Sequence, residues 1–136
     1  MDFNIWAIVA ATIVQFGIGA VWYIAVFPKQ WGETFGFDKL SEAKQKELQA
    51  QMGPYYGLQL VVTVLTSVGI AYLLSVTTIE WYNLAVWLWA GFVVPTQVSA
   101  VIFGGVEPQW IARRLAIMAS GSLACLLGAA YVISLF

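Results

Sequence analysis

Few side chains in this sequence can perform acid–base, nucleophilic or metal chemistry. Histidine is absent, and Cys125 is the single cysteine among 136 residues. The usual ligands of haem, zinc and iron–sulfur centres are therefore missing, and one thiol alone cannot form an intramolecular disulfide. We expect a protein with no cofactor, no bound metal and no catalytic residue.

The charged side chains lie outside the long apolar stretches of the chain. No charged residue occurs between Asp2 and Lys29, between Glu47 and Glu80, or after Arg114. Proton-coupled transporters and ion pumps normally hold a carboxylate or another titratable group at membrane depth. Transport driven by such a group is therefore disfavoured.

The remaining candidates are uncharged polar and aromatic side chains within the apolar stretches. Gln15 is the most informative, because an amide in the middle of such a stretch must find a hydrogen-bond partner. We expect that partner to lie on another helix, in a contact worth about 1 kcal/mol, and a contact with a solute is the alternative. The side chains that offer such polar or solute contacts are Gln15, Trp22, Tyr23, Gln59, Thr63, Thr96, Gln97 and Ser99.

Several of these polar side chains are predicted to lie at a similar depth. With helices that alternate in direction, Gln59, Thr63 and the polar residues after Pro95 fall in the half of the bundle near the charged connections. This arrangement allows a shallow cavity with Trp22 and Tyr23 on its wall. Small residues at packing intervals, such as Gly121 with Cys125 and Ala124 with Gly128, favour ordinary contacts between close helices instead. We expect structural contacts, and the cavity is the alternative.

The composition indicates that a bilayer, not water, surrounds most of the chain. The sequence is 61% hydrophobic and 10% charged, with a mean hydropathy of +0.82, whereas soluble domains have about a quarter charged residues. About 20 apolar residues cross a hydrocarbon core of roughly 30 Å. We therefore predict an all-α membrane protein, a bundle of four transmembrane helices in one domain over residues 1–136. The predicted helices are residues 5–27, 56–76, 82–103 and 115–136.

The connector over residues 28–53 is the one sizeable polar segment. It carries most of the charged residues, and Ser41 is a suitable N-cap for a short helix that begins at Glu42. Its apolar stripe is weak, so we expect a solvated cytoplasmic connector, with a helix that docks on a partner as the alternative.

The distribution of basic residues predicts the orientation in the membrane. All six lysines and arginines lie in the first and third connections between the predicted helices, which two spans separate and which therefore share one side. The positive-inside rule places that side in the cytoplasm. Both chain termini are then expected outside the cytoplasm.

The third predicted helix contains a proline that should bend it. Pro95 cannot donate a hydrogen bond to the carbonyl group of Gly91, four residues earlier, and Gly91 has no side chain to hinder a bend. We predict a kink between Gly91 and Gln97, with nearby hydroxyl groups bonding the freed backbone.

Two sequence patterns resemble a known family. Gly19-Ala20-Val21-Trp22-Tyr23, followed by Phe27 and Trp31, and later Gly91-Phe92-Val93-Val94-Pro95-Thr96 are similar to motifs of the DUF1761 family of small bacterial membrane proteins. Val21 replaces the leucine usual in that family, and Gln97 and Ser99 stand where asparagines are common. The resemblance spans nearly the whole chain. It implies a multi-pass protein of the bacterial inner membrane and assigns no catalytic or binding residue.

These observations favour a non-catalytic membrane protein. We expect a packing or accessory subunit that self-associates or binds another membrane complex, with the lipid bilayer around it. The alternative is a binding or transport site for a neutral or lipophilic small solute. An enzyme is disfavoured because no base, metal site or cofactor site can be assembled. A nucleic-acid partner is not expected, because the net charge is -1 and no basic face exists.

Overall fold

The computed structural model of the protein describes residues 4–136 and is almost entirely helical over that range. Four helical spans are long and apolar enough to cross a membrane, and the predicted all-α, four-helix architecture is therefore confirmed. The spans are Ile5–Val26, Gly53–Val76, Trp81–Ile102 and Pro108–Ser134.

Two of the four spans contain a segment wound as a π-helix. The first span consists of α1 (Ile5–Ala20) and a π-helical segment (Val21–Val26), and the third consists of α5 (Trp81–Leu88), a π-helical segment (Trp89–Val93) and α6 (Val94–Ile102). The second and fourth spans are the uninterrupted helices α4 (Gly53–Val76) and α7 (Pro108–Ser134). The connector after the first span contains α2 (Pro28–Glu33), a 3₁₀ turn (Phe37–Lys39) and α3 (Glu42–Ala50).

The helix ends follow local capping chemistry. Asn4 caps α1 by accepting a hydrogen bond from the backbone N–H of Trp6 at 3.0 Å, and Ser41 caps α3 by accepting one from the N–H of Lys44 at 3.2 Å. Proline needs no backbone N–H in the first helical turn, so Pro54 and Pro108 allow α4 and α7 to begin earlier than the apolar pattern indicates.

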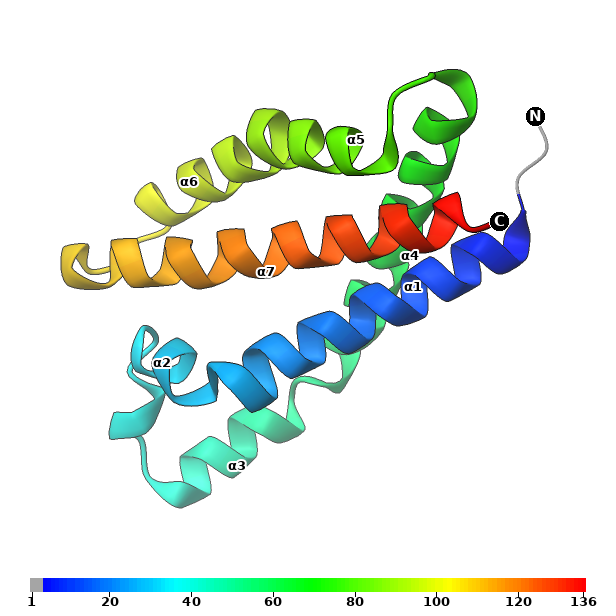
Figure 1. The fold of residues 1–136 in the computed structure, drawn as a ribbon. Helices are drawn as coiled ribbons and strands as arrows, with labels where there is room; N and C mark the ends of the chain where they lie inside the picture. Colours follow the sequence, from blue (N-terminus) through cyan, green and yellow to red (C-terminus); the bar gives the residue numbers. More distant parts are fainter. Residues whose placement is uncertain (1–3) are drawn as a thin grey trace.

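The helices meet most closely near the end that holds Asn4 and Phe136. α1 and α7 run antiparallel and pack against each other, α5 and α6 lie along α7, and α4 crosses α1 (Figure 1). The buried core between them is built largely from alanines, which let helix backbones approach closely. Its members are Ala11, Ile70, Ala85, Leu126, Ala129 and Ala130.

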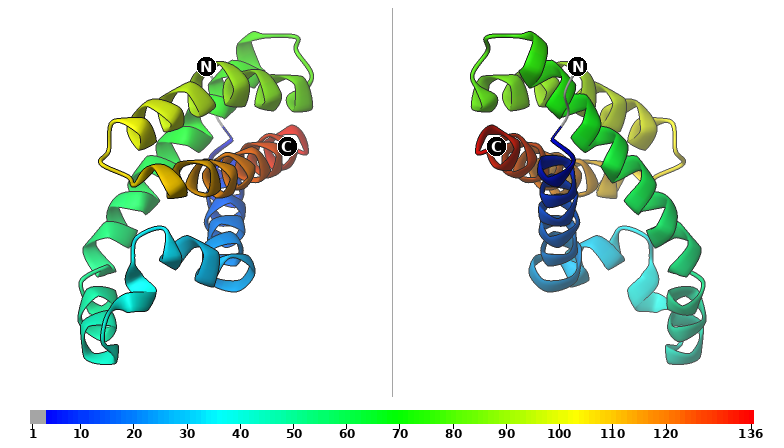
Figure 2. Two further views of the ribbon diagram at one scale, coloured as in Figure 1. Left: turned by 90° about the vertical axis from the view of Figure 1, so that its left-hand side faces the viewer. Right: turned by 90° about the vertical axis from the view of Figure 1, so that its right-hand side faces the viewer.

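α4 diverges from the other spans towards its N-terminal end. Its buried residues are Thr63, Ser67 and Ile70, whereas every residue from 53 to 62 is exposed. The two end-on views in Figure 2 show this part of α4 and the adjoining α3 leaning away from α1 and α7. The first ten of the 24 residues of α4 are therefore left exposed by the part of the chain that the structure describes.

The third span changes its winding where the kink was predicted. The N–H of Val94 donates to the carbonyl of Trp89, five residues earlier, and Pro95 then falls in the first turn of α6. A proline at that position removes no hydrogen bond of α6. The ribbon changes direction between α5 and α6 (Figure 1), and a bend angle at Gly91 and Pro95 stays a prediction.

Candidate functional sites in the bundle and at its charged end

A buried polar cluster joins α1 to α4. The Gln15 amide nitrogen donates to the Ser67 hydroxyl oxygen at 2.8 Å, and the hydroxyl groups of Ser67 and Thr12 lie 3.0 Å apart. All three side chains are buried. Water therefore cannot reach their polar atoms, and these hydrogen bonds satisfy them instead. Gln15 thus faces protein and bonds across helices, and its partner on α4 is Ser67.

A second set of hydrogen bonds converges on one turn of α7. The indole N–H groups of Trp22 and Trp89 donate to the backbone carbonyls of Ile117 at 3.1 Å and Ala119 at 2.8 Å. The amide nitrogen of Gln97 lies 3.4 Å from the carbonyl of Met118, between those two. A helical carbonyl keeps a second lone pair after its own backbone bond. Three consecutive carbonyls of α7 therefore accept hydrogen bonds from side chains of the first and third spans.

Both tryptophans belong to the π-helical segments. Trp22 lies in the first segment, and Trp89 begins the second. A π turn adds a residue to the helical repeat, which changes where the following side chains point. In this bundle both segments present an indole N–H to the same turn of α7.

Gly121 provides the space for the Trp22 ring on α7. A Cβ atom at Gly121 would lie 2.9 Å from the Cδ1 atom of Trp22 and 3.1 Å from its ring nitrogen. Gly128, two turns further along α7, is equally close to α1, because a Cβ there would lie 2.7 Å from the Cδ1 atom of Ile18. Both glycines permit the close packing of α1 on α7.

The other polar residues singled out from the sequence bond mainly within their own helices. The Gln59 amide nitrogen lies 3.3 Å from the Thr63 hydroxyl oxygen, and the Thr96 hydroxyl donates to the carbonyl of Phe92 at 2.6 Å. Tyr23 packs edge-on against Trp31, with ring centroids 4.9 Å apart, and Ser99 is exposed.

The eight candidate residues do not line one common space. Gln15 bonds across α1 and α4, Gln97 contacts α7, and Gln59 lies on the exposed part of α4. None of the eight lines either of the two clefts described at the ends of the bundle.

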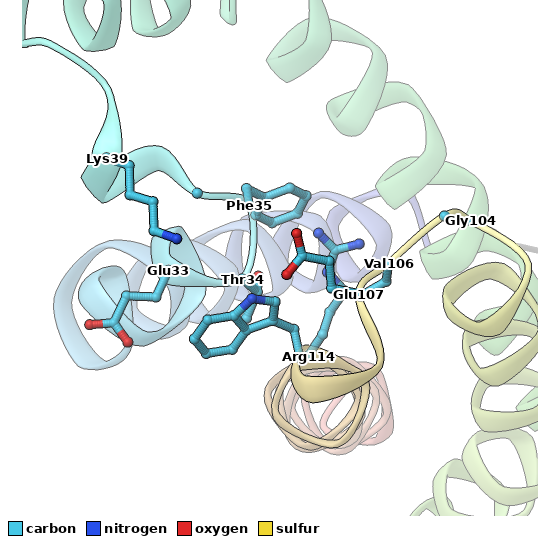
Figure 3. Close-up of a pocket in the computed structure, with 11 residues that line it drawn as sticks. Glu33, Thr34, Phe35, Lys39, Gly104, Val106, Glu107 and Arg114 are labelled. Carbon is cyan, nitrogen blue, oxygen red and sulfur yellow. The ribbon is translucent and has the colours of Figure 1, made fainter.

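One of these clefts, of about 460 Å³, lies at the end of the bundle that holds the basic residues (Figure 3). Residues 33–36 and Lys39, which follow the first span, form one wall, and residues 104–107 with Trp110 and Arg114 form the other. Arg113 joins the two parts of the chain beside the cleft by donating to a Glu33 carboxylate oxygen at 2.6 Å. The carbon at the centre of the Arg114 guanidinium lies 3.8 Å from the centroid of the Phe35 ring.

Sequence reasoning missed several of these contacts. Ser67 stands four residues after Thr63, and this helical spacing could have identified it as part of the polar face of α4. Gly121 was expected to lie at a helix contact, but its contact with Trp22 and the role of Trp89 have no local signal, because both depend on how the first and third spans are rotated against α7.

These features define a small multi-pass membrane protein whose four spans are joined by buried and half-buried polar contacts. A family model described as protein of unknown function (DUF1761) matches residues 6–134, and the chain therefore belongs to this family. The comparisons with curated proteins and with solved structures found no match.

Proposed function

We propose that this protein is a non-catalytic subunit that associates within the membrane with a second copy of itself or with another integral membrane protein. The observation that carries this proposal is the exposed position of Gln59 in residues 53–62, the exposed N-terminal part of α4. Exposed apolar side chains would not require a protein partner, because lipid covers them equally well.

The Gln59 amide, unlike an apolar side chain, requires hydrogen-bond partners. Its nitrogen makes one long hydrogen bond, of 3.3 Å, to Thr63 in the same helix. An amide that faces hydrocarbon without partners costs a few kcal/mol, roughly 2–7 depending on the reference state. A polar side chain or backbone group of a neighbouring helix would remove much of this cost. We infer that such a helix packs along residues 53–62 of α4.

The proposed setting is the bacterial inner membrane, with both termini outside the cytoplasm. The distribution of the six basic residues supports this orientation, because all of them lie in the connector after the first span or in the first turns of α7. In this orientation α3 and the basic end of the bundle face the cytoplasm, where a soluble part of a partner can reach them.

The test is to co-express two differently tagged copies, purify one in mild detergent, and identify the proteins that accompany it by mass spectrometry. We expect Gln59→Leu to reduce recovery of the partner several-fold while thermal unfolding of the chain changes little. Thr66→Val is the matched control, because Thr66 is also exposed on α4 and its hydroxyl bonds to the carbonyl of Val62 in the same helix. Equal recovery of the partner with Gln59→Leu and with the wild type would contradict the proposal.

A solute-binding role is the second candidate, and one observation favours it. The Gln97 amide oxygen is buried and has no hydrogen-bond partner among residues 4–136. A neutral solute with a hydroxyl or amide N–H group would satisfy that oxygen. A Gln97→Leu protein that unfolds at the wild-type temperature but no longer retains a co-purifying small molecule would favour this candidate over the subunit role.

A further inference from the structure

The cleft at the charged end of the bundle lies beside the ends of three apolar spans, where lipid headgroups are expected. The first span ends at Val26, the third ends at Ile102, and the fourth begins at Pro108. The cleft is lined by residues 33–36 and Lys39 of the connector, by residues 104–107 between the third and fourth spans, and by Trp110 and Arg114 in the first two turns of the fourth span. Trp110 lines it, and tryptophan is enriched where hydrocarbon meets headgroups.

The cleft holds charges of both signs that are not paired with each other. Glu33 forms an ion pair with Arg113, in which a guanidinium nitrogen lies 2.6 Å from a carboxylate oxygen. Among residues 4–136, Lys39 and Arg114 have no carboxylate oxygen within 4.0 Å, and Glu107 has no cationic nitrogen within that distance. Glu107 instead accepts a hydrogen bond from the Gln109 amide at 3.0 Å. Two cations and one carboxylate therefore remain available to a ligand.

The Arg114 side chain is held in place before any ligand binds. Its guanidinium stacks on Phe35 at 3.8 Å from the ring centroid and lies 5.8 Å from that of Trp31. Its Nε atom is buried and has no hydrogen-bond partner in the part of the chain that the structure describes. An arginine stacked in this way loses little side-chain freedom when its terminal N–H groups bind a phosphate.

The backbone leaves room beside these charges. Gly36 and Gly105 have φ angles of +70° and +74°, which favour glycine, and both line the cleft. A Cβ atom at either position would meet no atom within 4 Å. In Figure 3 Lys39 extends from one side of the cleft, and Glu107 and Arg114 extend from the other.

We propose that this cleft binds the phosphoethanolamine headgroup of a membrane phospholipid, with Lys39 and Arg114 on the phosphate and Glu107 on the ammonium group. The lipid chains would extend from the cleft along the apolar spans. Basic pockets between transmembrane helices are known positions for lipid headgroups. The inference is independent of the proposed subunit role, because it uses residues that line the cleft and not the exposed residues 53–62 of α4.

The Glu107 carboxylate favours a headgroup that carries a positive charge over other ligands that contain phosphate. The phosphate of an anionic headgroup such as phosphoglycerol can also pair with Lys39 and Arg114, but this headgroup has no cation for Glu107, whose carboxylate would lie near the phosphate without a partner. Inorganic phosphate has the same disadvantage and has no acyl chains to bury. A zwitterionic headgroup pairs both of its charges in the cleft.

The experiment measures lipid retention by native mass spectrometry. The protein is reconstituted in nanodiscs that contain equal amounts of phosphatidylethanolamine and phosphatidylglycerol, and the bound lipids are counted after release into detergent. We expect the wild type to retain phosphatidylethanolamine preferentially. The double variant Lys39→Gln, Arg114→Gln should lose this retention by about tenfold, which corresponds to one charge-assisted hydrogen bond.

A second variant tests the role of the carboxylate and avoids the packing of Arg114 on Phe35. Glu107→Gln changes an exposed side chain, so folding should be kept, and its preference should move towards phosphatidylglycerol. Lys46→Gln is the control, because Lys46 is exposed on α3 and lies 3.7 Å from Glu42. It should retain lipid as the wild type does.

Two outcomes would overturn the proposal. One is unchanged lipid retention in both the double variant and Glu107→Gln. The other is displacement of bound lipid by inorganic phosphate as readily as by glycerophosphoethanolamine, which would identify a simple anion site.

Discussion

The packing of Trp22 on Gly121 yields a sharp test of the bundle. Replacement of Gly121 by alanine places a Cβ atom 2.9 Å from the Cδ1 atom of Trp22, which is closer than carbon atoms approach in folded proteins. The indole ring is rigid and is held by its hydrogen bond to the carbonyl of Ile117 at 3.1 Å. Relief of the clash therefore requires the ring to leave its hydrogen bond or α1 to move away from α7.

The expected cost follows from these two effects. Overpacking of a well-packed interface costs about 1–3 kcal/mol, and loss of the Trp22 hydrogen bond adds about 0.5–1.5 kcal/mol. Alanine gains up to about 1 kcal/mol over glycine in helix propensity, which opposes both costs. We expect Gly121→Ala to destabilise the protein by about 1–3 kcal/mol.

Thermal unfolding in detergent, followed by far-UV circular dichroism and by tryptophan fluorescence, provides the assay. Gly69→Ala is the matched control, because a Cβ atom at Gly69 would meet nothing within 4 Å. A second comparison introduces Gly121→Ala into a Trp22→Phe background. The smaller ring should remove most of the added cost, so the two substitutions should not be additive. Equal unfolding temperatures for Gly121→Ala and Gly69→Ala would show that no such clash exists.

Two further predictions concern the polar cluster and the orientation. Ser67→Ala removes the partner of Gln15 and should lower stability by about 1–3 kcal/mol through the unpaired buried amide, measured by the same unfolding assay. Thr66→Ala, which removes an exposed hydroxyl one residue away, should have little effect, and equal losses would contradict the assignment. For orientation, single cysteines at Ser41 and Thr78 in a cysteine-free background are treated with a membrane-impermeant thiol reagent in intact cells. The cysteine at Thr78 should react and the cysteine at Ser41 should not, and the opposite pattern would invert the predicted topology.

The number of spans and their helical class could be predicted from the sequence. Apolar runs long enough to cross a bilayer, separated by charges and prolines, are local properties of the chain, and they suffice because each span satisfies its own backbone. The early starts of α4 and α7 were not predicted, because the expected helices followed the apolar runs and not the positions of Pro54 and Pro108. The need of Gln15 for a partner was also predictable, since desolvation of an amide is costly wherever the helix packs.

The contacts between side chains of different spans could not be predicted, because they depend on how the helices pack. Ser67 became the partner of Gln15 because α4 crosses α1 at that level, and the indoles of Trp22 and Trp89 reached α7 through helix rotations that leave no trace in hydropathy. Pro95 marked where the third span changes its winding, but neither the π-helical form of that change nor the segment Val21–Val26 was predicted from the sequence. The cleft between residues 33–39 and the start of α7 joins segments about 70 residues apart. Hydrophobicity places each helix in the bilayer, whereas the pairing of polar groups depends on the relative depth, rotation and tilt of all four.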